Sequence, residues 1–264
     1  MLGDFDLISH TFPDDEITIY PIADVHLGAI EHAESEWQAF LTRVKQENAY
    51  LIIAGDMLNN STRGVRFANP FDEAMRPRVA KKRMVEYLEP LASHLLCYLD
   101  GNHEARSSRD SDVSIGYDIC ARLCCEDIYR ENVAFMSIGV GTRNTSSNPK
   151  AVYTFMVEHG SGGGVLPGSV INKNERTATQ VVDGIDCLVV GHHHRGMISK
   201  PAKIVVDAAR KRVSVKHVVV ISCVSWLNYG GYAARSQLLP AQIADPQKLT
   251  LIGNKDRKRI ITTW

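Results

Sequence analysis

The stretch Tyr50-Leu51-Ile52-Ile53-Ala54-Gly55-Asp56 is a run of five apolar residues that ends in a glycine and an aspartate. A short, continuously apolar run is typical of a strand that is buried on both faces of a parallel sheet. Two other stretches repeat this pattern: residues 17–23 lead into Asp24-Val25-His26, and residues 95–99 lead into Asp100-Gly101-Asn102-His103. Each stretch therefore predicts a buried strand that is followed at once by polar residues.

Helical periodicity separates these three strands. Ala33, Trp37, Phe40, Leu41 and Val44 have the spacing of one helix face, and a second helical stretch covers about residues 72–91. This alternation predicts βαβ units and a largely parallel sheet.

The second half of the chain is richer in strands, which predict a second sheet packed on the first. Strands are expected over residues 133–140, 152–157 and 187–190. Residues 203–206 and 213–224 are expected to form an antiparallel pair of strands. Helices are expected over about residues 113–125 and 177–182.

The composition excludes several classes of protein. Thirty Lys and Arg residues balance thirty Asp and Glu residues, so the formal net charge of the 264-residue chain is zero. A protein that coats nucleic acid by bulk charge and an acidic disordered chain are both excluded. The 44% of apolar and 23% of charged residues are typical of a soluble domain with a sizeable core.

No apolar run approaches the roughly 20 residues that span a bilayer, and the N-terminal residues lack a positively charged leader. We therefore expect no membrane partner and a cytoplasmic location. We also expect one domain over residues 1–264, with its motifs in residues 16–224 and a C-terminal extension over residues 225–264.

Five segments place Asp, Asn or His residues just past the end of an expected strand. These residues are Asp24, His26, Asp56, Asn102, His103, His159, His192 and His194. In open α/β sheets ligands bind beyond the carboxyl ends of the strands, so we expect these side chains to meet at one edge. Carboxylates and imidazoles suit Mn, Fe, Zn or Ni rather than calcium. Two such ions about 3.5–4 Å apart can clamp both oxygens of a phosphoryl transfer.

The motifs resemble those of the calcineurin-like metallophosphoesterases. The motifs D-x-H at 24–26, G-D at 55–56, G-N-H-E at 101–104, His159 and G-H-x-H at 191–194 occur in the order of that superfamily. With this resemblance we expect an α/β fold, a four-layer α/β/β/α sandwich of two mixed sheets flanked by helices. The metal site is expected at the C-terminal edge of the strands.

The resemblance also implies a role for each residue of the motifs. Asp24, His26 and His194 would hold one metal ion, Asn102, His159 and His192 the other, and Asp56 would bridge them. We expect two divalent transition-metal ions, with Mn favoured over Fe, Zn or Ni, and a metal-activated hydroxide that attacks phosphorus. His103 would stabilise the transition state or protonate the leaving oxygen. Asp24, Asp56 and Glu104 are alternative candidates for orienting the imidazoles.

The substrate is indicated by the first motif. Residues 23–28, Ala-Asp-Val-His-Leu-Gly, resemble the branch of Mre11/SbcD-type DNA nucleases, in particular its compact bacterial and phage members. Glu104 departs from the GNHD that is more usual in that branch, and GNHE is shared with protein phosphatases. The sequence therefore predicts a phosphodiester hydrolase that acts on DNA. A phosphomonoesterase, or a small-nucleotide or protein phosphatase of the same fold, is the alternative, and a binding module without metals is disfavoured by the complete ligand set.

Contacts to the substrate are expected from His193, Arg63 and Arg66. Basic residues also cluster over residues 76–83, 210–212 and 255–259, where they either track a phosphate backbone or form solvated faces. Trp226, Tyr229 and Tyr232 either stack on a base or pack in the protein. Related nucleases are often dimeric, and a homodimer stays an open alternative.

Overall fold

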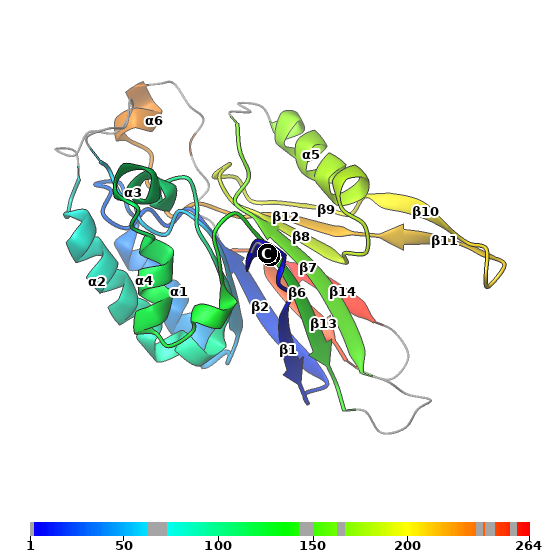
Figure 1. Ribbon diagram of the computed structural model, residues 1–264. Helices are drawn as coiled ribbons and strands as arrows, with labels where there is room; N and C mark the ends of the chain where they lie inside the picture. Colours follow the sequence, from blue (N-terminus) through cyan, green and yellow to red (C-terminus); the bar gives the residue numbers. More distant parts are fainter. Residues whose placement is uncertain are drawn as a thin grey trace.

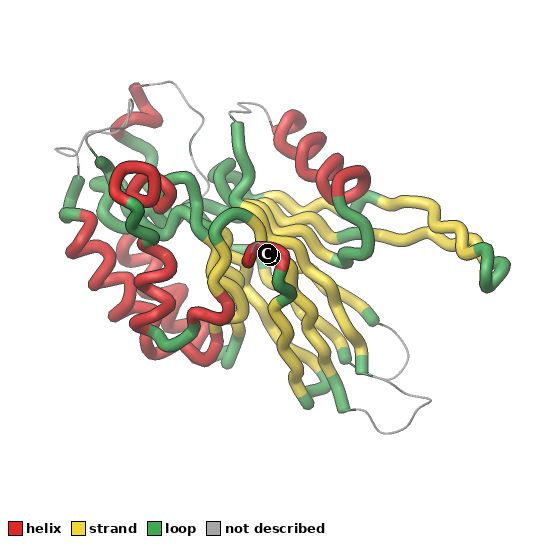
Figure 2. The backbone as a smooth tube through the Cα atoms, in the orientation of Figure 1, coloured by secondary structure: helices red, strands yellow, loops and turns green. Residues whose placement is uncertain are grey.

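Two mixed sheets pack face to face, and helices cover their outer faces (Figures 1 and 2). The computed structural model describes residues 3–62, 73–142, 150–162, 167–235, 240, 246–253 and 258–264, and within this part each of the two sheets has six strands. The expected four-layer α/β/β/α sandwich is confirmed.

The first sheet has the strand order β14-β13-β2-β3-β4-β5. Its strands are β2 (Glu16–Ile22), β3 (Tyr50–Ala54), β4 (Leu95–Leu99), β5 (Tyr129–Arg130), β13 (Lys248–Ile252) and β14 (Arg259–Thr263). The strands β2 to β5 are parallel, as the alternation of strands and helices predicts. The antiparallel strands β13 and β14 extend the sheet at β2, so residues from the C-terminal extension complete this layer.

Helices α1 (Glu34–Gln46), α2 (Pro77–Leu88) and α4 (Ile115–Arg122) cover the outer face of the first sheet (Figure 1). Helix α1 buries Trp37, Phe40, Leu41 and Val44, the face that the sequence predicts. Helix α2 begins at Pro77, whose fixed φ suits a first helical position, and ends in the 3-10 turn η3 (Glu89–His94).

The second sheet has the strand order β1-β6-β7-β8-β12-β9. Its strands are β1 (Ile8–Phe12), β6 (Val133–Val140), β7 (Ala151–Glu158), β8 (Cys187–Val190), β9 (Met197–Ser199) and β12 (Val219–Ser222). In β8, Cys187 and Val189 face the large core, whereas Leu188 and Val190 join a smaller cluster with Ala178 of the π-helical turn η5 (Thr177–Val181). This strand is therefore buried on both faces, and helix α5 (Pro167–Arg176) lies over the outer one.

Several elements differ from the prediction. The expected strand over residues 213–224 is divided at Val218 into β11 (Arg212–His217) and β12, and only β12 joins the sheet. The expected helix over residues 113–125 is shorter, and the separate helix α3 (Glu104–Ser111) precedes it. Asp112 ends α3 with a φ of 56°, a left-handed conformation that stops a helix. The short elements η1 (Gly3–Phe5), η4 (Glu126–Ile128) and α6 (Gly231–Arg235) complete the described chain.

Strand β10 (Ala202–Asp207) pairs with β11 in a hairpin that projects from the body of the molecule (Figure 1). On one face of this hairpin, Ile204 lies opposite Val215 and Val206 lies opposite Val213, and these four side chains are 61–73% exposed. No helix in the described residues is both long and apolar enough to cross a membrane.

Candidate metal centre

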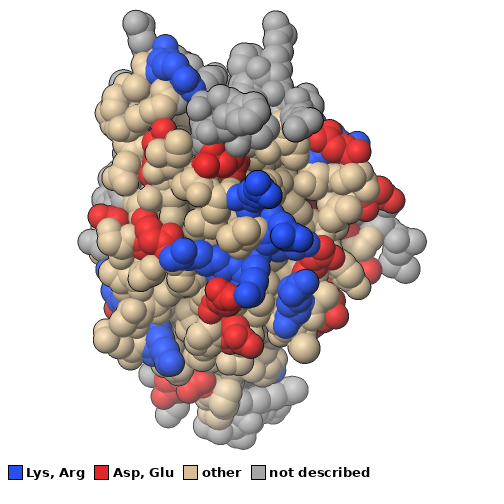
Figure 3. Space-filling view, turned by 90° about the vertical axis from the view of Figure 1, so that its left-hand side faces the viewer, with Lys and Arg blue, Asp and Glu red and all other residues tan. Residues whose placement is uncertain are grey.

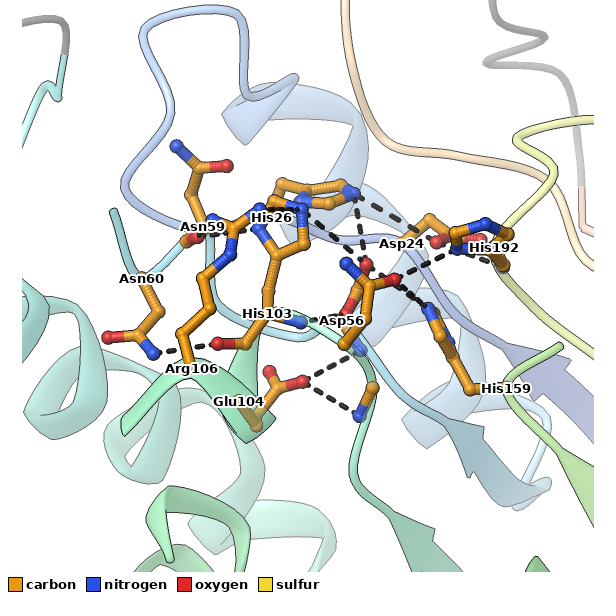
Figure 4. Close-up of polar contacts among 12 residues, drawn as sticks. Asp24, His26, Asp56, Asn59, Asn60, His103, Glu104, Arg106, His159 and His192 are labelled. Carbon is orange, nitrogen blue, oxygen red and sulfur yellow. Dashed lines mark hydrogen bonds and ion pairs between the residues drawn. The ribbon is translucent and has the colours of Figure 1, made fainter. Parts of the chain in front are cut away.

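The carboxyl ends of β2, β3 and β4 from the first sheet meet those of β7 and β8 from the second sheet (Figure 4). Three overlapping groups of side chains lie there, and within each group the potential ligand atoms are within 4.8 Å of one another. The groups are Asp24, His26 and His194; His26, Asp56 and His103; and Asp56, His159 and His192. The structure therefore brings together the residues that the sequence predicts at one sheet edge.

Asp56 lies in the middle of the centre. Its Oδ2 atom is 3.2 Å from His159 Nε2, 3.8 Å from His103 Nε2 and 3.9 Å from His26 Nε2. Its Oδ1 atom accepts a hydrogen bond of 2.8 Å from the His103 backbone N–H. This position between the two sets of imidazoles is the one that a bridging carboxylate requires.

Asp24, His26 and His194 form one side of the centre. His26 Nε2 and His194 Nε2 are 3.2 Å apart, and Asp24 Oδ1 lies 3.5 Å from His194 Nε2 and 3.9 Å from His26 Nε2. Asp24 Oδ2 is buried and has no hydrogen-bond partner among the residues that the structure describes. Because an unpaired buried carboxylate oxygen is costly, this donor set fits a cation.

Asn102, His159 and His192 form the other side. His159 Nδ1 donates to the Ala54 carbonyl oxygen over 2.8 Å, which leaves Nε2 facing Asn102 Oδ1 at 3.0 Å and Asp56 Oδ2 at 3.2 Å. His192 Nδ1 also faces Asn102 Oδ1, at 2.9 Å. A lone pair on Nε2 would repel two oxygen atoms, so His159 either carries a second proton or shares a cation with them. This set of donors also fits a metal ion.

The pKa shifts of the buried carboxyl and imidazole groups agree with a site that binds cations. Burial raises the pKa of Asp56, but the His103 and His159 imidazoles outweigh that effect and hold the pKa well below its usual range. Burial lowers the pKa of His159, but Asp56 outweighs it and raises that pKa to about 10. Burial lowers the pKa of His194 to about 4, and that of His26 falls for the same reason. Burial raises the pKa of Asp24, and a cation nearby would stabilise its ionised form.

The backbone turns sharply at the ligand positions. Five of the seven predicted ligands have a positive φ: Asp24 at 55°, His26 at 49°, Asp56 at 54°, His192 at 70° and His194 at 53°. Residues with a side chain rarely adopt this left-handed region, and each costs on the order of 1–3 kcal/mol when the surroundings impose it. Such strain is concentrated at functional sites. The packed ends of the buried strands hold these residues in place.

The glycines before three of the ligands let the loops approach each other. A Cβ on Gly101 would lie 2.1 Å from Asp56 Oδ1, and one on Gly55 would lie 2.7 Å from the Gly101 Cα. A Cβ on Gly191 would lie 2.7 Å from the Ala54 carbonyl oxygen. The glycine of each G-D, G-N and G-H pair is therefore required by backbone contact between neighbouring loops.

Replacing Gly101 with alanine should displace Asp56 and destabilise the protein by about 3 kcal/mol or more, because the contact is with a rigid backbone as well as a carboxylate. We expect a lower midpoint of thermal unfolding and a lower metal content. Gly168→Ala in helix α5 is the control, since its Cβ would meet no atom within 4 Å. Equal unfolding midpoints for the two variants would contradict this account of the glycines.

Glu104 has a role that the sequence does not reveal. Its side chain is fully buried and accepts hydrogen bonds from the backbone N–H groups of Asp56 (3.0 Å), Leu58 (2.9 Å) and Gly101 (2.9 Å). Burial and the neighbouring Asp56 raise its pKa to about 7. Glu104 therefore holds two ligand loops together by their backbones, and it makes no hydrogen bond to an imidazole in the described residues.

His103 lies beside the metal-binding side chains. Its Nδ1 is 2.5 Å from the Asn59 carbonyl oxygen, and its Nε2 is 2.8 Å from Arg106 Nη2. Nδ1–H therefore donates to Asn59, and the Nε2 lone pair accepts from Arg106. Burial lowers the pKa of His103; Asp56 opposes this effect, and Arg106 adds to it. Its ring is a neutral imidazole in this arrangement, and Asn60 fixes its backbone by donating to the His103 carbonyl oxygen over 2.7 Å.

The predicted substrate contacts and the aromatic side chains lie in different environments. His193 is half-buried and belongs to none of the three groups in the described residues, while Arg63 and Arg66 lie outside the described residues. Trp226 is 3% exposed and its ring centroid lies 5.1 Å from Trp37, so it packs in the core and is not available to a base. Tyr229 is 51% exposed.

No protein-family model matches the chain, and no curated protein sequence matches it. Among solved structures, GAP50, the anchor in the inner membrane complex of Plasmodium, is 12% identical with a TM-score of 0.45, over 94% of this chain and 84% of that chain. A metallophosphoesterase from Sphaerobacter thermophilus is 13% identical with a TM-score of 0.39, over 92% of this chain and 90% of that chain. Similarities with TM-scores this low identify neither a family nor a function for this chain.

Proposed function

We propose that this protein is a metal-dependent phosphodiesterase of the calcineurin-like type and that its substrate is DNA. The observation that carries the proposal is the convergence of two carboxylates, one amide oxygen and four imidazoles at one edge of both sheets. These residues are Asp24, Asp56, Asn102, His26, His159, His192 and His194. The set contains no thiolate, so it suits Mn, Fe, Zn or Ni in an open catalytic site better than a structural zinc site.

A pair of divalent ions in this site would supply Lewis acidity to the phosphoryl oxygens and balance the charge of the transition state. Asp24, His26 and His194 would hold one ion, and Asn102, His159 and His192 the other, with Asp56 between them. The residues of the chain do the positioning: His159 is fixed by the Ala54 carbonyl, and His103 by Asn59. His103 would contact the reacting phosphoryl group or its leaving oxygen through Nε2, which for this step must carry a proton and exchange the hydrogen bond from Arg106 for one to the substrate.

The DNA assignment is based on the Ala23–Gly28 motif and on exposed basic side chains of the helices that cover the first sheet. Lys and Arg gather in the middle of the face formed by helices α2, α3 and α4 (Figure 3). Arg78 of α2, Arg109 of α3 and Arg122 of α4 are exposed basic residues of these helices. Other basic residues are already paired, since Lys81 Nζ lies 2.6 Å from Asp118 and Arg83 Nη2 lies 2.7 Å from Glu34. The exposed residues of this face remain to contact a phosphate backbone.

The test compares substrates with manganese present: single-stranded, duplex and nicked DNA, bis-p-nitrophenyl phosphate, p-nitrophenyl phosphate and a phosphopeptide. We expect hydrolysis of DNA and of the diester. Hydrolysis of the monoesters alone would replace the proposal with a phosphatase. A purified protein without bound transition metal that manganese does not stimulate would contradict an enzymatic role altogether.

His103→Ala should keep its metal content and lose about 100-fold or more in turnover, the usual contribution of a positioned acid or transition-state contact. Metal analysis and steady-state kinetics on bis-p-nitrophenyl phosphate measure the two effects separately. His94→Ala is the control, because the half-buried His94 ring contacts Asn48 and Tyr50 and belongs to none of the three groups of ligand residues. Full activity of His103→Ala on DNA would refute the role given to His103.

A further inference from the structure

Arg106 is a half-buried cation beside the metal centre, and no carboxylate of the described residues pairs with it. It lies on helix α3, three residues after His103, and its guanidinium donates from Nη1 to the Asn59 carbonyl oxygen (2.9 Å) and from Nη2 to His103 Nε2 (2.8 Å) (Figure 4). No ion pair to Arg106 occurs in the described chain. A guanidinium has five N–H donors, so three of them remain for a further acceptor.

The two hydrogen bonds fix where the guanidinium lies. His103 Nε2, which accepts from Arg106, is 3.8 Å from Asp56 Oδ2 at the middle of the centre, and the His103 and His26 ring centroids are 4.4 Å apart. The guanidinium is therefore separated from the metal ligands by a single imidazole. An anionic group seated on the centre would place oxygen atoms within reach of the free donors.

The free-energy cost of partly burying the Arg106 guanidinium also indicates that an anion binds beside it. A partly buried charge is unfavourable unless an opposite charge compensates it. Burial lowers the pKa of the Arg106 guanidinium, and the carboxylates of Asp56, Glu104 and Glu73 only partly oppose this effect from a distance. The planar fork of an arginine matches the geometry of phosphate oxygens better than a lysine does.

We propose that Arg106 binds a non-bridging phosphoryl oxygen of the substrate, with its side chain held by the Asn59 carbonyl oxygen and positioned against His103 before the substrate binds. This inference depends on the proposed function and names the group that the site recognises next to the metal ions. Because every phosphoester carries this oxygen, Arg106 contributes to binding of the phosphate and not to recognition of a base.

The experiment measures binding of inorganic phosphate to the manganese-loaded protein by isothermal titration calorimetry. Arg106→Gln should bind phosphate about 10- to 100-fold more weakly, the range for a hydrogen bond to a charged group, and Arg106→Lys should fall between this variant and the natural protein. Manganese affinity and the unfolding midpoint should not change. Arg176→Gln is the matched control, since Arg176 is an exposed arginine on helix α5, outside the basic face of helices α2, α3 and α4.

A double-mutant comparison separates direct binding from an effect through His103. If Arg106 contacts phosphate, Arg106→Gln should still weaken phosphate binding about fivefold or more in a His103→Ala background. No further weakening in that background, or normal phosphate affinity of Arg106→Gln alone, would overturn the inference. Either result would leave the proposed function intact if the natural protein hydrolyses phosphodiesters. A natural protein that binds no manganese and cleaves no phosphoester would remove both proposals.

Discussion

Replacing Asp56 with asparagine should give a protein that retains neither metal ion and hydrolyses phosphodiesters at least about 1,000-fold more slowly. Asp56 Oδ2 lies between His159, His103 and His26, so one substitution affects both sides of the centre. An amide has nearly the same shape but lacks the negative charge that two neighbouring cations need. It also leaves the His159 cation of the metal-free protein without its counter-ion.

Metal content and turnover together measure the effect of Asp56→Asn. Asp100→Asn is a matched control: Asp100 is also buried after a strand, but burial and the nearby Glu104 raise its pKa well above the usual range. A buried carboxyl whose pKa is raised loses less electrostatic stabilisation on replacement by a neutral amide than one whose pKa is lowered, as that of Asp56 is. We expect Asp100→Asn to keep both its metal and its activity. Full metal content in Asp56→Asn would contradict the bridging position.

Glu104→Ala should strongly destabilise the protein. It removes the acceptor of three buried backbone N–H groups, those of Asp56, Leu58 and Gly101. Each unsatisfied donor costs about 1–3 kcal/mol, so we expect a loss of at least about 3 kcal/mol in the free energy of unfolding. For a chain of this size the unfolding midpoint should fall by at least about 6 °C.

Thermal unfolding of the metal-free protein isolates this effect from metal binding. Glu104→Gln keeps one acceptor oxygen and should lose less stability than Glu104→Ala. Glu86→Ala is the surface control, because the Glu86 side chain is 57% exposed and its ion pair with Lys82 is solvated. A midpoint for Glu104→Ala within about 2 °C of the Glu86→Ala value would show that the three hydrogen bonds do not stabilise the loops as described.

The strands that precede the metal-binding residues were predictable from their continuous apolar runs. Continuously apolar runs such as residues 50–54 have no solvent-facing side, and the residue after each run must leave the sheet at its carboxyl edge. The face of α1 was predictable for a similar reason, since Trp37, Phe40, Leu41 and Val44 repeat with the helical period. The positions of the predicted ligands follow from these elements.

Elements without a periodic apolar pattern were not predictable. Helix α3 buries only Glu104 and has no apolar face, so its sequence shows no helical signal. Arg106 depends on this helix and was missed with it. Strand β13 does alternate, with Leu249 and Leu251 buried, and that signal would have placed the C-terminal region in a sheet. The contacts of Glu104 with the backbone amides of Asp56, Leu58 and Gly101 depend on the tertiary fold, and they assign the last residue of the GNHE motif to holding the loops together.

The metal centre takes its donors from both layers of the sandwich: Asp24, His26, Asp56 and Asn102 follow strands of the first sheet, and His159, His192 and His194 follow strands of the second. Any cation held there would cross-link two sheets that pack through a large apolar core and a few hydrogen bonds, such as those of Tyr153 to Ile252 and Arg259. Its binding free energy would then add to the free energy needed to separate the two sheets at that edge. The concentration of free metal would therefore affect the stability of the folded protein as well as its activity.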